Sequence, residues 1–184
     1  VGVAPNGNVV AILRKRNPAT NKSEYISYIS DDNGVTFNET YNLSNSPNVN
    51  VARVSVPNMT ISMDNGKMMF ISQTYTLNTY GVFAIFSSDN GVSWTESSQI
   101  FAQNNSNANL LPSEIRPTYL GEGRIIAFAR NQAGGNLFQL TSEDYGLNWK
   151  CELTNISDCK INCAMAVYSK PYDLLALYYT NRDS

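Results

Sequence analysis

One eight-residue pattern occurs three times in this chain, at residues 30–37, 87–94 and 142–149. Each copy, which we call a box, reads Ser-x-Asp-x-Gly-x-polar-aromatic, and the three aspartates lie 57 and 55 residues apart. The shared positions are Ser30, Asp32, Gly34 and Phe37, then Ser87, Asp89, Gly91 and Trp94, then Ser142, Asp144, Gly146 and Trp149. A repeat with a period near 55 residues indicates a propeller or a similar array.

Each box has the chemistry of a tight turn between two strands. Asn33-Gly34 and Asn90-Gly91 are strong turn dipeptides, because both residue types tolerate positive φ. The Ser and Asp side chains can bond turn amides, and the closing aromatic side chain can fill the apolar layer between sheets. We interpret the boxes as turns that stabilise the structure rather than as ligand or metal sites. A calcium loop shares part of the Asp-x-Asn-x-Gly order, but its terminal glutamate is missing here.

Strand-like runs flank each box in the same order, and the clearest unit extends from Glu114 to Leu153. It predicts four strands, at 114–119, 124–130, 136–142 and 148–153, and four antiparallel strands make one propeller blade. No convincing helix is present. We therefore expect an all-β fold, a partial β-propeller of four-stranded antiparallel blades with box turns. The chain is one such domain, 1–184, with blades at roughly 1–48, 49–108 and 109–158 and the start of a fourth at 159–184.

The predicted array is not closed. The chain enters late in the first strand of a blade, near residues 1–4, and leaves after the second strand of another, at 174–179. Propellers usually close with four to eight blades, and an open stack exposes strand edges. We expect the missing blades to come from the rest of a longer chain or from oligomer partners.

Composition excludes several classes of function. Charged residues make up 15% of the chain and the net charge is −2, so there is no electrostatic case for binding nucleic acid. No apolar run approaches 18 residues, so no membrane span is expected. Cys151, Cys159 and Cys163 lie close together, but a chain without histidine makes a poor zinc site, and we predict no metal and no cofactor. One local disulfide with a free thiol and three reduced cysteines both remain open.

Six Asn-x-Ser/Thr sequons occur, at Asn21, Asn38, Asn42, Asn58, Asn104 and Asn155. The Asn and Ser/Thr content alone predicts about four matches to this motif. The sequons therefore permit a secreted protein, or one on a cell or virion surface, without requiring it.

Two features resemble the sialidase (neuraminidase) family, whose catalytic domain is a six-bladed β-propeller. The boxes look like the Asp-boxes of these enzymes, although non-catalytic propellers carry such boxes too. Residues 113–132 resemble a more specific sialidase stretch, in which an inner-strand glutamate precedes a glycine turn, an apolar strand and an Ala-Arg-Asn step. The resemblance implies that Glu114 polarises a nucleophilic tyrosine. It also implies that Arg130 is one of three arginines that bind the sialic acid carboxylate.

The residues themselves add a third candidate. Glu114 and Arg116 are two positions apart on one strand, so alternation predicts that they point to the same face. A guanidinium group suits a carboxylate ligand because its paired N–H donors match both oxygens. We predict that Glu114, Arg116 and Arg130 face one cleft or channel. Two alternatives stay open: a Glu114–Arg116 ion pair in the channel wall, and a role for Arg130 in bonding a loop.

The chain also departs from the sialidase pattern. It has no Arg-Ile-Pro segment, and Lys22, Ser23 and Glu24 stand where the acid/base aspartate is expected. The third arginine and the nucleophilic tyrosine would lie beyond Ser184. The leading hypothesis is a propeller segment that recognises an acidic sugar or glycoconjugate, as part of an exo-α-sialidase, although this piece alone should not turn over a sialoside. The alternative is a non-catalytic box propeller for adhesion, protein binding or assembly. Sorting-receptor propellers share the boxes but not the Glu–Arg stretch.

Overall fold

The structure of the chain, a computed structural model, describes residues 1–21, 23–46, 59–76, 79–102, 110–132, 134–157 and 164–179. Of residues 74–76, 79 and 96–98 it describes the backbone alone. Helical structure in these ranges is limited to two 3-10 turns, η1 (Leu43–Asn45) and η3 (Lys170–Tyr172). The all-β prediction is therefore confirmed.

Fourteen strands of the described chain form three four-stranded antiparallel sheets and one two-stranded sheet. The first sheet has the order β1 (Gly2–Val3), β2 (Val9–Arg16), β3 (Ser23–Ser30) and β4 (Asn38–Asn42). The second has the order β5 (Ile61–Ser62), β6 (Met68–Thr76), β7 (Thr79–Ser87) and β8 (Thr95–Ala102). The third consists of β9 (Pro112–Gly121), β10 (Arg124–Asn131), β11 (Phe138–Ser142) and β12 (Lys150–Leu153). β13 (Met165–Ser169) and β14 (Leu174–Tyr178) form the two-stranded sheet.

The predicted strands of the third repeat agree with β9–β12 to within two residues at each end. The partial propeller with box turns is thus the observed fold. The blade boundaries near 48, 108 and 158 all fall outside or at the edge of the described residues, and they stay a prediction.

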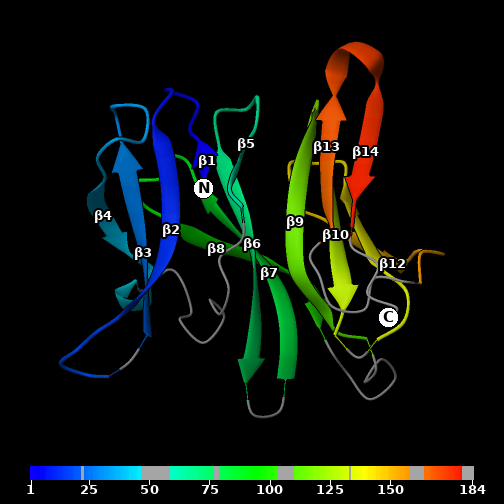
Figure 1. Ribbon diagram of the computed structural model, residues 1–184, viewed down its shortest axis with the longest axis horizontal. Helices are drawn as coiled ribbons and strands as arrows, with labels where there is room; N and C mark the ends of the chain where they lie inside the picture. Colours follow the sequence, from blue (N-terminus) through cyan, green and yellow to red (C-terminus); the bar gives the residue numbers. More distant parts are fainter. Residues whose placement is uncertain are drawn as a thin grey trace.

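The sheets stand side by side, from the first sheet through the second and third to β13–β14 (Figure 1). Their leading strands contact one another in sequence, β1 with β5, β5 with β9 and β9 with β13. Apolar layers fill the spaces between consecutive sheets, and their fully buried members include Trp94 and Phe70 between the first and second, and Phe138 and Ile71 between the second and third. Because each sheet packs against its neighbours through these layers, the ends of its strands are held in fixed positions.

Each box forms the turn between the third and fourth strands of its sheet. In the second box, the hydroxyl of Ser87 donates to Asp89 at 2.8 Å and accepts the Gly91 N–H at 2.8 Å. Asp89 also accepts the N–H of Ser93 at 2.8 Å. The other two boxes repeat these contacts from Ser30 and Ser142 onward. The box residues thus satisfy their turn amides with their own side chains.

The expectation that every box aromatic points inward is wrong for the first box. Trp94 is fully buried and Trp149 packs against the layer between the second and third sheets, whereas Phe37 is 41% exposed. The reason is geometric: each aromatic side chain points toward the preceding sheet, and the described residues place no sheet before the first.

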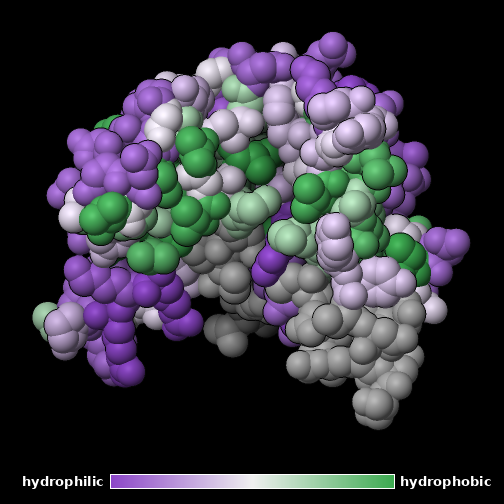
Figure 2. Space-filling model, turned by 45° about the horizontal axis from the view of Figure 1, so that its top comes forward, coloured by the Kyte–Doolittle hydropathy of each residue, from purple (hydrophilic) through white to green (hydrophobic). Residues whose placement is uncertain are grey.

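The turn-bearing end of the molecule is shown in Figure 2, where hydrophobic residues form separate patches among hydrophilic ones. The residue after each box glycine is apolar and exposed, namely Val35, Val92 and Leu147. Each box thus presents one exposed apolar side chain beside its glycine.

Candidate functional site

Glu114 and Arg130 form an ion pair at one end of the third sheet. The Arg130 Nε–H donates to Glu114 Oε2 at 2.8 Å, and the two side chains are 18% (Arg130) and 32% (Glu114) exposed. Arg130 lies at the end of β10, whereas the box lies beside the start of β10, where Ile125 pairs with Ser142. The pair is therefore at the end of the sheet opposite to the box turn.

A β-bulge shapes the backbone at this pair. Between the Arg116–Phe128 and Ser113–Arg130 pairings, β9 carries one more residue than β10. Glu114 has a φ of 56°, in the left-handed region that few residues other than glycine adopt. Bulges of this kind re-aim a side chain, and they are frequent beside active sites. The strict alternation assumed from the sequence does not hold across the bulge, so the direction of the Glu114 side chain follows from its bond to Arg130.

A buried glutamine of the second sheet holds this bulge. Gln73 on β6 is 3% exposed; its Oε1 accepts the Glu114 N–H at 2.9 Å and its Nε2 donates to Ser113 Oγ at 3.0 Å. Gln73 was not among the site residues predicted from the sequence. One signal could have found it: Arg14, Gln73 and Arg130 occupy the same position in the three repeats, seven residues after a turn glycine.

Arg116 lies on the same face of the β9–β10 pair as Arg130. It is directly opposite Phe128, and Arg130 is two residues farther along β10, so both arginines lie on one face, with the β9 bulge between their pairings. This face is turned toward β13–β14, because Phe128 packs with Ala166 and the Arg116 Nη1 lies 3.9 Å from Met165 Sδ. This face of the third sheet thus carries two guanidinium groups, of which Arg130 is paired with Glu114 and Arg116 lies beside Met165. The predicted Glu114–Arg116 pair is not the one that forms.

The predicted shared cleft around these three residues stays a prediction. Two hollows of the described chain lie elsewhere. One of about 350 Å³ lies over the outer strands of the third sheet, between Phe128 and Leu177. The other, of about 490 Å³, lies beside the third box, at Asp144 and Trp149.

The remaining chemistry of the described residues is limited. They contain no group of three His, Cys, Asp or Glu side chains placed to hold a metal ion. Burial raises the pKa of the Cys151 thiol to about 11, with help from Glu152, so this free cysteine is a thiol at neutral pH. Cys159 and Cys163 lie outside the described residues. In the same ranges there is no helix of the length and apolar character that crossing a bilayer requires.

Comparison with protein families gives one match, to the BNR repeat-like domain, over residues 1–181. A comparison with curated proteins finds no match. Among solved structures, a Hadza microbial sialidase superposes with a TM-score of 0.64 and 17% identity over 90% of this chain and 35% of its own.

Two further similar structures are, by their names, an arabinanase and an arabinofuranosidase. An α-L-arabinanase of Penicillium chrysogenum, complexed with arabinobiose, has a TM-score of 0.59 and 20% identity over 86% of this chain and 48% of its own. An α-L-arabinofuranosidase from Fusarium graminearum has a TM-score of 0.58 and 17% identity, over 89% of this chain and 49% of its own. At such low identities, these TM-scores show that the chain shares the fold of these glycoside hydrolases. The chain spans between a third and a half of the length of these three proteins.

Proposed function

Because the chain belongs to the BNR repeat-like domain family, we propose that it forms part of a propeller that recognises an acidic sugar, with terminal sialic acid as the leading candidate. The proposed site is the face of the third sheet that carries Arg130, Arg116 and Glu114. In a longer protein the same site would serve an exo-α-sialidase.

The observation that supports this proposal most is how Arg130 uses its donors. Its Nε–H is taken by Glu114, which fixes the plane of the guanidinium group. Its two terminal nitrogens form no hydrogen bond or ion pair with any residue that the structure describes. At the equivalent position of the second sheet, the Gln73 amide bonds to the next sheet instead. An arginine that is oriented, and whose two terminal nitrogens keep four N–H donors unused by the described residues, is suited to a carboxylate ligand.

Each of the three residues has a distinct part in this proposal. Arg130 pairs with the sugar carboxylate, and Arg116 adds a second positive charge on the same face. Glu114 orients Arg130. In a complete sialidase it would also draw the proton from a nucleophilic tyrosine, as the sequence resemblance implies. No such tyrosine is identified here, so we expect this chain to bind without turnover.

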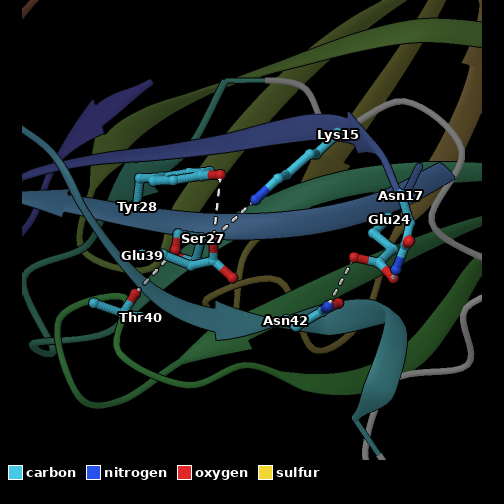
Figure 3. Close-up of polar contacts among 8 residues, drawn as sticks. All are labelled: Lys15, Asn17, Glu24, Ser27, Tyr28, Glu39, Thr40 and Asn42. Atoms are coloured by element: carbon cyan, nitrogen blue, oxygen red, sulfur yellow. Dashed lines mark hydrogen bonds and ion pairs between the residues drawn. The ribbon is translucent and has the colours of Figure 1, made fainter. Parts of the chain in front are cut away.

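A non-catalytic binding module is the second candidate, and one observation favours it. Glu24 stands near the place expected for the acid/base aspartate, and its carboxylate is engaged on both sides. Asn17 donates to it at 2.7 Å and Asn42 at 3.3 Å (Figure 3). A carboxylate held by two amides on the first sheet is ill placed to transfer a proton to a sugar.

Titration with two sugars tests the proposal. We expect the methyl α-glycoside of sialic acid to bind in the millimolar range, because charge-assisted hydrogen bonds contribute about 1.5–3 kcal/mol each. NMR shifts would report the binding. Arabinobiose, which is neutral, should bind at least tenfold more weakly, since it lacks the carboxylate (a loss of about 1.4 kcal/mol or more).

Two arginine variants make the test specific. Arg130→Gln should weaken sialoside binding about tenfold or more, as expected for the loss of an ion-paired donor set. Arg124→Gln is the matched control, because Arg124 lies on the same strand at the opposite end. Equal binding of both sugars, or unchanged binding in Arg130→Gln, would overturn the acidic-sugar proposal. Turnover of a fluorogenic sialoside that disappears in Glu114→Gln would show that this chain is itself an enzyme.

A further inference from the structure

We propose that Gln73 is a positioning residue for the Glu114–Arg130 pair, so that the site on the third sheet is set by the second sheet. The consequence for sugar binding rests on the proposed function above. The consequence for the geometry of the pair does not, because it follows from the contacts alone.

The contacts make Gln73 well suited to this part. It is almost fully buried, and its amide bonds two successive residues of β9: its Oε1 accepts the backbone N–H of Glu114 and its Nε2 donates to the side-chain hydroxyl of Ser113. Ser113 is itself buried. A buried amide with both ends bonded cannot rotate without leaving polar groups unsatisfied, so it defines one position for this part of β9.

The conformation of Glu114 shows why such a brace is needed. A left-handed φ is unfavourable for a residue with a Cβ, and it persists only where the surroundings enforce it. The Gln73 side chain accepts a hydrogen bond from the backbone N–H of Glu114, the residue that has this φ. If that bond is lost, we expect the bulge to relax toward ordinary extended backbone. The Glu114 carboxylate would then move away from the Arg130 Nε–H.

Hydrogen exchange measured by NMR on the intact chain tests the geometry. In Gln73→Met, which keeps the length but removes both hydrogen bonds, the Glu114 amide and the Arg130 Nε–H should each exchange about tenfold faster or more. Gln139→Met is the matched control, because Gln139 lies on β11, in the same sheet as Glu114 and Arg130. In this variant both exchange rates should stay unchanged. The amides of the paired residues Ala127 and Leu140 should keep their wild-type rates in both variants.

Two outcomes would overturn the proposal. One is unchanged exchange at Glu114 and Arg130 in Gln73→Met. The other is a uniform acceleration at all amides, which would mean that Gln73 only ties the sheets together. If Gln73→Met does not fold, Ser113→Ala gives the same test, because it removes the group that orients the Gln73 amide. Faster exchange at both sites then supports the proposal, and unchanged exchange overturns it.

Sugar binding separates this inference from the proposed function. If the wild-type chain binds the sialoside, Gln73→Met should weaken binding about tenfold or more while Gln139→Met does not, and equal binding in both variants would contradict the positioning role. If the wild-type chain binds neither sugar, the proposed function is wrong. The exchange rates of Glu114 and Arg130 still decide whether Gln73 positions the pair.

Discussion

The first and second sheets carry nearly the same box, yet their boxes lie in different surroundings. The two turns share their serine–aspartate–amide bonds, but Trp94 is fully buried and Phe37 is 41% exposed. The Trp94 Nε1–H also donates to Ser27 on the first sheet, at 3.2 Å. The comparison shows that a box has two separable parts, a local turn and a docking surface for the preceding sheet.

The box glycines show the same division. Both have a φ near 86°, so both serve the turn. A Cβ on Gly91 would lie 2.8 Å from a Val10 methyl of the first sheet, whereas a Cβ on Gly34 would meet only the Phe37 ring, at 3.9 Å. Glycine is needed for conformation in the first box, and for conformation and close approach in the second.

The outer face of the first sheet also differs from the packed faces of the second. It carries a polar network in which Lys15 pairs with Glu39 at 3.4 Å and Glu39 also accepts from Tyr28 (Figure 3). In the second sheet, Phe70 and Ile85 are fully buried against the first. The side chains on a sheet face are therefore buried only where a second sheet packs against that face.

The largest expected difference is between the two box aromatics. Trp94→Ala should lower the free energy of unfolding by about 3–5 kcal/mol, because it empties a fully buried site. Phe37→Ala should cost less than about 1 kcal/mol, as for an exposed side chain. Denaturant unfolding of both variants measures the two losses, and similar losses would contradict the division into turn and docking surface.

The glycines should give the next largest difference. Gly34→Ala should cost about 1–2 kcal/mol for a left-handed residue with a Cβ. Gly91→Ala should cost about 1–3 kcal/mol more, because the added methyl overpacks the contact with Val10. Thermal or denaturant melts give both values. Equal costs would show that the first sheet yields to the methyl group and that close approach at Gly91 is not required.

This contrast also marks what could be predicted from the sequence. The Asn-Gly steps and the strand-like runs specify turns and strands locally, so the positions of the boxes and of β9–β12 were predictable. The exposure of Phe37 was not, because the box sequence is the same whether or not a sheet precedes it. Local pattern determines the element, and neighbouring sheets determine its burial.

The candidate site divides in the same way. The approach of Glu114 to Arg130 could be predicted, because both belong to one hairpin that resembles a known stretch. The bulge could not, because glutamate gives no signal for a positive φ. Gln73 was not predicted, because the segment that it contacts lies 41 residues away in the sequence and only its alignment with Arg14 and Arg130 in the repeats pointed to it.

A smaller effect, on pH dependence, should be common to the two boxes. The pKa of Asp32 is lowered, first by the Ser30 hydroxyl and then by Thr36. Burial raises the pKa of Asp89, but bonds from Ser93 and Ser87 lower it by more. Both folded-state pKa values thus lie below the ordinary value of 3.8.

The sign of the pH effect follows from these shifts. The unfolded chain binds more protons below about pH 4, so stability should fall as the pH falls through this range. Asp32→Asn and Asp89→Asn should each make that fall shallower, which urea unfolding at pH 3 and pH 6 can measure. If only Asp89→Asn had this effect, the local turn would depend on docking, against the proposed division.

The smallest effect should come from the polar network on the outer face of the first sheet. Lys15 and Glu39 are each about half exposed, and an exposed ion pair contributes about 0.2–1 kcal/mol, because water screens the charges and both side chains lose freedom. Lys15→Met keeps the aliphatic stem over the sheet and removes only the charge. We therefore expect a loss of at most about 0.5 kcal/mol in low salt, and none in high salt. A loss above about 1 kcal/mol that persists in high salt would contradict this expectation. It would mean that the polar network contributes to the stability of the first sheet as much as packing against a neighbouring sheet contributes to that of the second.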